Sequence, residues 1–400
     1  MKTEIFTDNL NKAAELIKAG ELVAVPTETV YGLAGNGLDA EAVEKIYEVK
    51  GRPAVKPLAL MVPDAEAMEK YCINVPQQAK YLAEKFWPGP LSIVLKSKDK
   101  VPEIVRAGGD TVSMRCPDHA MTLELLKLSG LPFAAPSANP SGEPSPKNAE
   151  TVAKYFDGEI AGIIDGGECG LGRESTIIDM SRIPYRILRQ GALSEEKIRK
   201  ALAENVRKIG ITGGTGCGKT TALLELEKNG ARIIDCDAVY HEMLESDAEM
   251  LLDIKDEFPA AFIEGKLDRK ALGNIVFADE NKLCKLNEIT HAHIIRRVQS
   301  MIADFAMEGG EVAAIDAIAL IESGIAKECD TVIGIISSRE KRIERIMLRD
   351  GISREYAAKR VDAQKNDAFY MENCEFVVRN DKSEKTFIHV FNDLIAKEVL

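Results

Sequence analysis

Apolar positions along the first half of the chain change repeatedly between a helical and a strand spacing. Residues 9–19 carry apolar side chains on one helical face and end at Gly20, and the run 21–25 that follows predicts a short strand. A second helix is expected over 40–49. Further short apolar runs bounded by glycine or proline predict strands at 92–95, 111–115 and 176–179. This alternation predicts an α/β domain whose sheet mixes strand directions.

The second half shows five apolar runs of strand length, separated by helical patterns. A mostly helical insert, 239–307, separates the second run from the third, and a helix over 383–398 closes the pattern. Strands that alternate with helices usually form parallel sheets, so we expect a parallel five-stranded sheet. The five predicted strands are 206–212, 231–237, 311–316, 330–337 and 375–380.

A glycine-rich segment, Gly213–Thr220, links the first of these five strands to a helix. It reads G-x-x-x-x-G-K-[ST], and the strand before it and the helix after it supply the context of a phosphate-binding loop. Glycines let backbone N–H groups turn around an anion, and the helix N-terminus adds the positive end of its dipole. We expect Lys219 to reach the β- and γ-phosphates and the Thr220 hydroxyl to hold Mg²⁺. The residues expected to bind the phosphates of ATP are Gly213, Gly214, Thr215, Gly216, Cys217, Gly218, Lys219, Thr220 and Thr221.

Three aspartates stand at the ends of predicted strands near this loop. Asp235 and Asp237 close the second strand and Asp316 closes the third, so their carboxylates are expected at the carboxyl edge of the sheet. Such groups coordinate Mg²⁺ or accept a proton from an attacking hydroxyl. For Asp316, a helix cap is an equally good interpretation. The expected Mg²⁺ ligands are Thr220, Asp235 and Asp316.

Arginines recur along the segment that follows the fourth predicted strand of the second half. Their spacing places them on one side of a helix, where they form either a solvated face or a lid that closes over a phosphate. They are Arg339, Arg342, Arg345 and Arg349, followed by Arg354, Arg360 and Gln364. In the insert, His291 and His293 point apart on a helix and therefore do not form a metal-binding pair.

The polar residues of the first half gather in rigid glycine- and proline-rich turns. Lys50 and Arg52 lie on an extended segment fixed by Pro53, from which both cations can project toward an anion. Arg115 stands at a strand end before a proline. Ser137 and Asn139 form a Ser-x-Asn turn between prolines. Hydroxyl groups and acids packed into such turns are costly unless they bind something.

Composition bounds the remaining possibilities. The 400 residues exceed what one core usually serves, so we expect two domains, 1–204 and 205–400. A net charge of −12 argues against broad nonspecific nucleic-acid binding. The eight cysteines are spread singly without a C-x-x-C pair, which argues against a zinc site. The N-terminus lacks the pattern of a signal peptide and no apolar run reaches membrane length, so a cytoplasmic location is expected.

Seven motifs of the first half resemble the YrdC/TsaC threonylcarbamoyl-AMP synthases, in family order across residues 5–200. They are PTETVYGL, KGRP with a following PL, FWPGPL, MRCP, APSANPSG, ESTIID and RILRQG. The resemblance implies formation of threonylcarbamoyl-AMP and pyrophosphate from L-threonine, bicarbonate and ATP, an intermediate of threonylcarbamoyladenosine in tRNA. It implies ATP binding by Lys50, Arg52, Ser137, Asn139 and Arg189, and threonine binding by Thr27, Arg115 and Ser175. One departure is Met61, where two-domain relatives carry a histidine that helps hold threonine.

The second half resembles dephospho-CoA kinase over almost its full length. The resemblance rests on IGITGGTGCGKTT, the strand end IIDCD, LNEITHAHI, the segment RIMLRDGISRE and the closing FVVRND. It implies that Asp237 is the base for the ribose 3′-hydroxyl of dephospho-CoA. It also implies that Asp235 and His291 bind the acceptor, and that Arg345 and Arg349 lie near ATP or the transferring phosphate.

The favoured interpretation is a bifunctional enzyme with two ATP sites, both dependent on Mg²⁺. The partners implied are ATP, L-threonine, bicarbonate and dephospho-CoA, with no membrane. Contact with the tRNA-modifying machinery and direct RNA binding are left open. The alternatives are a non-catalytic, RNA-binding YrdC-like module in the first half and a P-loop kinase of another small metabolite in the second. In a third alternative, one half is a structural partner of the other.

Overall fold

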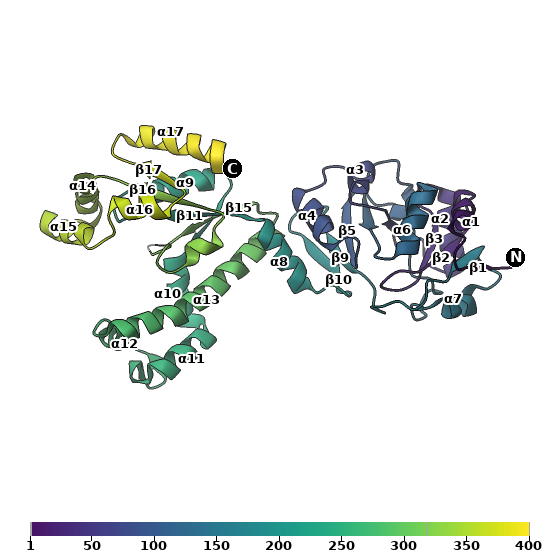
Figure 1. Ribbon diagram of the computed structural model, residues 1–400, viewed down its shortest axis with the longest axis horizontal. Helices are drawn as coiled ribbons and strands as arrows, with labels where there is room; N and C mark the ends of the chain where they lie inside the picture. Colours follow the sequence, from purple (N-terminus) through teal and green to yellow (C-terminus); the bar gives the residue numbers. More distant parts are fainter. Residues whose placement is uncertain (1, 318, 400) are drawn as a thin grey trace. The chain divides into compact units, whose positions relative to one another are not determined.

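The computed structural model describes residues 2–317 and 319–399, and it separates into two compact units (Figure 1). The first unit holds the residues up to Asn205 together with Met307–Gly309. The second holds Val206–Ala306 and the residues from Gly310 onward. Among the described residues, no helix combines the length and the apolar character needed to cross a bilayer.

A ten-stranded sheet runs through the first unit, and its strands pair in both directions. The parallel pair β2–β8 lies next to the antiparallel pair β2–β3, for example, so the predicted mixed sheet is confirmed. In sheet order the strands are β1 (Glu4–Phe6), β8 (Gly162–Ile164), β2 (Val23–Val25), β3 (Gly32–Asn36), β7 (Phe133–Ala134), β4 (Ala59–Met61), β6 (Thr111–Arg115), β5 (Leu91–Lys96), β9 (Thr176–Asp179) and β10 (Arg186–Arg189).

Eight helices accompany this sheet in the described part of the first unit. They are α1 (Leu10–Lys18), α2 (Ala40–Lys50), α3 (Ala67–Tyr71), α4 (Gln77–Phe86), α5 (Glu103–Arg106), α6 (Ala120–Ser129), α7 (Ala149–Phe156) and α8 (Glu195–Asn205). Helix α1 places Leu10, Ala13, Ala14 and Ile17 on one face, as its helical spacing predicts. These side chains pack with Leu125 and Leu126 of α6 against the strands in one buried cluster.

Four adjacent strands of this sheet, β4, β6, β5 and β9, provide the floor of the first candidate site. Strand register pairs Met61 with Arg115 and Ala59 with Ser113. Because side chains two residues apart on a strand share a face, both pairs lie on the same side of the sheet. The alternation in β6 therefore brings Ser113 and Arg115 to one surface while Val112 and Met114 are buried.

The second unit contains the predicted parallel five-stranded sheet. Every neighbouring pair in it is parallel, which confirms the predicted fold class. The strands, in sheet order, are β12 (Arg232–Asp235), β15 (Val312–Asp316), β11 (Arg207–Thr212), β16 (Thr331–Ile336) and β17 (Phe376–Arg379). A separate two-stranded hairpin, β13 (Phe262–Ile263) with β14 (Lys266–Leu267), lies within the insert.

The helices of the second unit include the long α13, which carries α11 and α12 away from the sheet (Figure 1). Their bounds are α9 (Lys219–Lys228), α10 (Cys236–Ser246), α11 (Ala248–Glu257), α12 (Arg269–Val276), α13 (Glu280–Met307), α14 (Arg339–Asp350), α15 (Arg354–Asp362), α16 (Asp367–Asn373) and α17 (Glu384–Leu394). The predicted helical character of the insert is thus confirmed.

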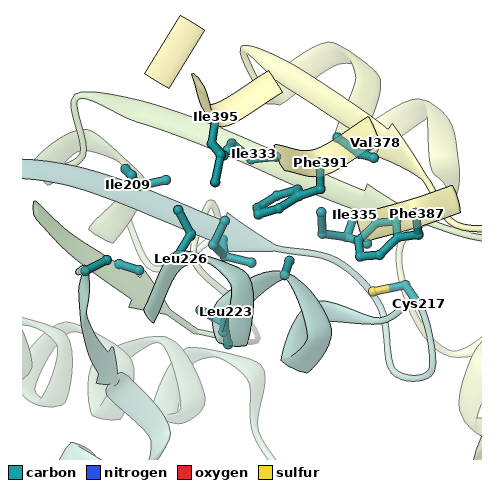
Figure 2. Close-up of a cluster of buried hydrophobic side chains, with 14 residues drawn as sticks. Ile209, Cys217, Leu223, Leu226, Ile333, Ile335, Val378, Phe387, Phe391 and Ile395 are labelled. Atoms are coloured by element: carbon teal, nitrogen blue, oxygen red, sulfur yellow. The ribbon is translucent and has the colours of Figure 1, made fainter. Parts of the chain in front are cut away.

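One face of this sheet carries the main apolar cluster of the second unit. Leu223 and Leu226 of α9 and Phe387 and Phe391 of α17 meet the inward residues of the central strands (Figure 2). The strand residues of the cluster are Ile209, Ile211, Ala314, Ile333, Ile335 and Val378. Since β11 and α9 both contribute to this cluster, the loop between them is anchored at both of its ends.

The second strand of the unit is shorter than its apolar run predicts. It ends at Asp235, and α10 begins at the next residue instead of after Asp237. The cause is local, because the Asp235 carboxylate accepts hydrogen bonds from the backbone N–H groups of Asp237 and Ala238 at 2.9 and 3.0 Å. Asp235 is therefore the N-cap of α10, and Asp237 lies in its first turn.

Candidate active sites

A cavity of about 320 Å³ opens over the four-strand floor of the first unit. Five of the residues predicted to bind substrates line it together, although they come from distant parts of the chain. They are Arg52, Arg115, Ser137, Ser175 and Arg189. Three guanidinium groups around one cavity make it suited to a ligand with several negative charges.

The Arg115 guanidinium is buried and paired with a carboxylate that was not among the predicted site residues. Its Nη2 lies 2.7 Å from Oε1 of Glu28, and its Nε donates to the carbonyl oxygen of Gly89 at 3.1 Å. The other oxygen of Glu28 accepts the backbone N–H of Asp118. Glu28 thus fixes Arg115 at the cavity wall. The position of Glu28 in the PTETVYGL motif was the sequence signal that could have identified it as a site residue.

A second unpredicted carboxylate, Glu174, holds Arg189. The two groups form a hydrogen-bonded ion pair, and Arg189 also donates to the carbonyl oxygen of Ser175 from Nε and Nη2. The Ser175 hydroxyl lies 2.9 Å from that of Ser92, on the neighbouring strand β5. The ESTIID and RILRQG motifs therefore meet in space and form one edge of the cavity, which Glu174 also lines.

Lys50 lies beside the cavity lining instead of in it. Its side chain is buried, and its ammonium group donates to the carbonyl oxygens of Ser137 and Asn139. Burial lowers the pKa of Lys50 to about 8, with a further lowering by the positive charge of Arg52. In this arrangement Lys50 supports the Ser-x-Asn turn, and its contact with ATP stays a prediction.

The side chains of Thr27 and Asn139 also form hydrogen bonds with backbone groups in this structure. The Thr27 hydroxyl donates to Val30 O at 2.6 Å and accepts the N–H groups of Thr29 and Val30, which closes the turn. Asn139 donates to the carbonyl oxygens of Pro140 and Glu143. Both residues stabilise turns beside the cavity. Met61, which stands at the position where two-domain relatives carry a histidine, lines the cavity itself. Their direct contact with substrates stays a prediction.

The phosphate loop of the second unit depends on glycine at three positions with left-handed backbone. Gly213, Gly216 and Gly218 have φ angles of +146°, +79° and +105°. A Cβ at Gly213 would lie 2.2 Å from Ile335 O, and one at Gly218 would lie 2.2 Å from Nδ2 of Asn380. Side chains at these positions are therefore excluded by both conformation and space.

The carbonyl groups of this loop are held from outside by side chains of later elements. Arg345 Nη1 donates to Gly216 O at 3.1 Å, and its Nη2 donates to Asn380 O at 2.9 Å. Asn380 Nδ2 in turn donates to Cys217 O at 2.9 Å. Arg349, the other arginine predicted near ATP, forms an ion pair with Asp350 on the exposed side of α14. Nucleotide contact by either arginine stays a prediction.

Lys219 meets Asp316 directly behind the loop. Its Nζ lies 2.8 Å from Oδ1 of Asp316, and strand register places Asp316 opposite Asp235. Thr220 follows Lys219 in the first turn of α9. A hydroxyl and two neighbouring carboxylates are the hard oxygen donors that Mg²⁺ takes together with phosphate oxygens and water. The residues present therefore fit the predicted metal, whose binding stays a prediction.

A second cavity of about 130 Å³ lies beside α10 and α13. The structure brings together here two residues predicted for the acceptor site, Asp237 and His291, with Tyr240 and Asn287. Burial lowers the pKa of His291, so this imidazole is neutral at physiological pH. His293 points elsewhere, with Nε2 at 2.7 Å from the Asp253 carboxylate, which agrees with the expectation that the two histidines diverge.

The Cys217 sulfur turns into the apolar cluster beneath the loop (Figure 2). The side chain is 1% exposed, and burial raises the pKa of the thiol. A thiol held in its protonated form is a poor nucleophile. The Cys217 side chain is therefore an apolar anchor of the loop.

Two family models match the chain, one in each half. The Sua5/YciO/YrdC model, described as telomere recombination, matches residues 15–191. The CoaE model, described as dephospho-CoA kinase, matches residues 207–386. The first match covers the residues of the first site, and the second match covers those of the second site.

The curated relatives match about half of the chain. The threonylcarbamoyl-AMP synthase of Pyrococcus abyssi is 50% identical over 192 residues, which are 48% of this chain and 56% of that protein. The chain thus spans about half the length of this relative. A putative threonylcarbamoyl-AMP synthase of Mycobacterium tuberculosis is 35% identical over 197 residues, 49% of this chain and 90% of that protein.

For the second half, the solved dephospho-CoA kinase of Campylobacter jejuni is 26% identical. The match covers 48% of this chain and 96% of that one, at a TM-score of 0.36. The family assignments rest on the two matched models and on the curated relatives. The chain belongs to the Sua5/YciO/YrdC family through its first half, and residues 207–386 of its second half match the family model described as dephospho-CoA kinase.

Proposed function

We propose that the chain is a bifunctional enzyme that forms L-threonylcarbamoyl-AMP in its first unit and phosphorylates dephospho-CoA in its second. The observation that carries the proposal is that each half assembles its own polar site within its own unit. The first gathers Arg52, Arg115 and Arg189 around one cavity, and the second joins a phosphate loop to the cavity of Asp237 and His291.

In the first unit the reaction requires positioning and charge neutralisation. The threonine amine adds to carbon dioxide derived from bicarbonate, and a carbamate oxygen then attacks the α-phosphate of ATP, releasing pyrophosphate. Arg115 is suited to a bidentate grip on the threonine carboxylate, because Glu28 already fixes its guanidinium. Arg52 and Arg189 supply positive charge for the phosphates. No nucleophile from the protein is needed.

In the second unit Asp237 accepts the proton of the ribose 3′-hydroxyl as that oxygen attacks the γ-phosphate of ATP. The phosphate loop holds the β- and γ-phosphates through backbone N–H groups, with Lys219 as the nearby cation. Thr220, Asp235 and Asp316 would hold Mg²⁺, which when bound neutralises charge on the phosphate oxygens. Neutral His291 lies where the acceptor enters and offers one ring N–H and one acceptor nitrogen.

The deciding experiment measures both reactions on three proteins: wild type, Lys219→Ala and Arg52→Ala. Wild type should release pyrophosphate with threonine and bicarbonate, and should convert dephospho-CoA to CoA. Lys219→Ala should lower only the second rate, and Arg52→Ala only the first, each by at least about 100-fold. Loss of both activities in Lys219→Ala would overturn the two-site proposal.

Absence of pyrophosphate release from wild type would remove the first assignment and favour an RNA-binding module. Rapid phosphorylation of another small alcohol, with dephospho-CoA inert, would remove the second assignment. Because both rates come from one preparation, the activity that survives in each variant shows that the unmutated unit is intact, and circular dichroism compared with wild type checks the mutated one.

A further inference from the structure

Gly214 and Thr215 are two of the four residues of the phosphate loop that the G-x-x-x-x-G-K-[ST] pattern does not specify. Thr215 is contacted by one side chain from another part of the second unit, Gln364, which follows the end of α15. Gln364 is separated from Thr215 by 149 residues in sequence. The proposed kinase mechanism does not use it.

Gln364 forms two hydrogen bonds with Thr215. Its Oε1 accepts the backbone N–H of Thr215 at 2.9 Å, and its Nε2 donates to the Thr215 hydroxyl at 2.8 Å. The planar amide thus matches a donor and an acceptor of a single loop residue. Such two-point contacts fix orientation as well as distance.

Arg342 of α14 completes the arrangement. Its Nη2 donates to the same Oε1 of Gln364, and its Nε donates to Thr215 O at 3.0 Å. Thr215 is therefore held through its N–H, its carbonyl and its hydroxyl. The Arg342 side chain is buried, although it lies in a run of arginines whose spacing also suits a solvated face.

Gly214 leaves the space that Gln364 and Arg342 need to reach Thr215. A Cβ at this position would lie 2.2 Å from Nη2 of Arg342 and 2.9 Å from Oε1 of Gln364. Any larger residue would push both side chains off the loop. Gly214 and Thr215 are thus explained by one tertiary contact, in which the glycine leaves space for the two side chains and the threonine provides the groups that they hydrogen bond.

We propose that Gln364 is a positioning residue of the kinase site, which with Arg342 clamps Thr215 and holds the phosphate loop in its ATP-binding shape. The inference rests on the proposed kinase function. The Thr215 N–H belongs to the clamp, and the phosphates are bound by N–H groups nearer the start of α9. The clamp also ties the loop to α14 and α15, so the arginine-bearing helices and the loop form one body.

The test compares steady-state kinetics of dephospho-CoA phosphorylation in wild type, Gln364→Leu, Gln364→Glu and Thr215→Val. Leucine keeps the size of Gln364 but cannot hydrogen bond, so the KM for ATP should rise about tenfold. The kcat and the KM for dephospho-CoA should stay within about threefold. Glutamate accepts from the N–H, the hydroxyl and Arg342, and should keep the KM for ATP within about threefold of wild type.

Thr215→Val removes the hydroxyl alone and should raise the KM for ATP by about threefold. In the double variant with Gln364→Leu the two effects should be clearly less than multiplicative, because both remove the same contact. An unchanged KM for ATP in Gln364→Leu, or equal losses in Leu and Glu variants, would overturn the clamp. A fall in kcat with both KM values unchanged would overturn it as well.

A separate measurement keeps this test independent of the acceptor. ATP binding is followed by calorimetry, and the heat that Lys219→Ala removes is assigned to the kinase site. Gln364→Leu should weaken that binding about tenfold even if dephospho-CoA proves not to be the acceptor. Pyrophosphate release by the first unit, unchanged in all variants, controls for protein concentration, and the unchanged KM for dephospho-CoA in Gln364→Leu controls for the fold of the second unit.

Discussion

The two candidate sites present positive charge to an anion by opposite means. In the first unit the charge is carried by side chains, with Arg52, Arg115 and Arg189 around one cavity. In the second unit it comes mostly from oriented backbone N–H groups at a helix N-terminus, with Lys219 as the added cation. Under the proposed function, one chain therefore contains both of the common protein solutions to binding a nucleotide phosphate.

The difference lies in what holds each site ready before a ligand arrives. Side-chain cations are fixed by carboxylates, since Glu28 holds Arg115 and Glu174 holds Arg189. In the second site the backbone N–H groups need no counterion, although the added cation Lys219 is paired with Asp316, and carbonyl groups of the loop accept hydrogen bonds from Arg345 and Asn380. The first site should be sensitive to the removal of charge, and the second to the addition of volume.

The largest effect is expected for Asp237, the proposed proton acceptor of the second site, which the first reaction does not need. Asp237→Asn should lower the kcat for dephospho-CoA phosphorylation by about 10²- to 10⁴-fold, because the amide cannot accept the hydroxyl proton. Pyrophosphate release by the first unit should be unchanged. Asp268→Asn, which changes the N-cap of α12, is the matched control. A rate within about threefold of wild type would remove Asp237 from this role.

The next effect tests the sensitivity of the loop to volume. Gly218→Ala should lower the phosphorylation rate by about 100-fold, because the added carbon meets the buried Asn380 amide at 2.2 Å and φ is +105°. Gly230→Ala has a similar φ of +88° but meets nothing within 4 Å, so it separates steric conflict from backbone strain. If both variants lose the same activity, steric contact with Asn380 is not the cause.

The charge sensitivity of the first site can be measured as stability. Arg115→Met leaves the Glu28 carboxylate, whose side chain is 14% exposed, without its charged partner and should lower the unfolding free energy of the first unit by about 3–5 kcal/mol. Trp87, the single tryptophan of the sequence, is buried in this unit, so its fluorescence reports that unfolding. Adding Glu28→Gln should recover much of the stability without restoring activity. A double variant no more stable than Arg115→Met would contradict this account.

The smallest effect concerns the pH dependence that Lys50 contributes. Burial lowers its pKa from 10.5 to about 8, so between these values the unfolded chain binds the additional proton. The unfolding free energy of wild type relative to Lys50→Met should therefore rise with pH across this window, by about 1 to 3 kcal/mol. Urea unfolding followed by Trp87 fluorescence at pH 8, 9 and 10 measures it. If this difference in unfolding free energy falls or stays constant as the pH rises, burial does not lower the pKa of Lys50.

Sequence patterns predicted the local features of both units well. The glycine loop, the five parallel strands and the mixed sheet all follow from spacing and turn residues, which act over a few positions. Asp237 and His291 line one cavity, and their roles there stay a prediction. These features depend on local preferences and on the order of elements, which a single sequence contains.

The pairings between distant segments could not be predicted in the same way. Glu28 stands in a quoted motif, yet only the fold brings it to Arg115 across 87 positions. The arginines of α14 fit a solvated face or a lid by spacing, while the structure turns Arg342 and Arg345 toward the carbonyls of the loop. Helical periodicity identifies which residues share a side, but the packing of the helix decides what that side meets.

The burial of Cys217 has a practical consequence for work with oxidants and labels. Its sulfur is packed among apolar side chains, whereas Cys284 on α13 is exposed. Maleimide reagents and mild peroxide should therefore react first at Cys284 and spare the loop. A fluorophore can then be attached to the long helix of the insert while the nucleotide site stays chemically intact.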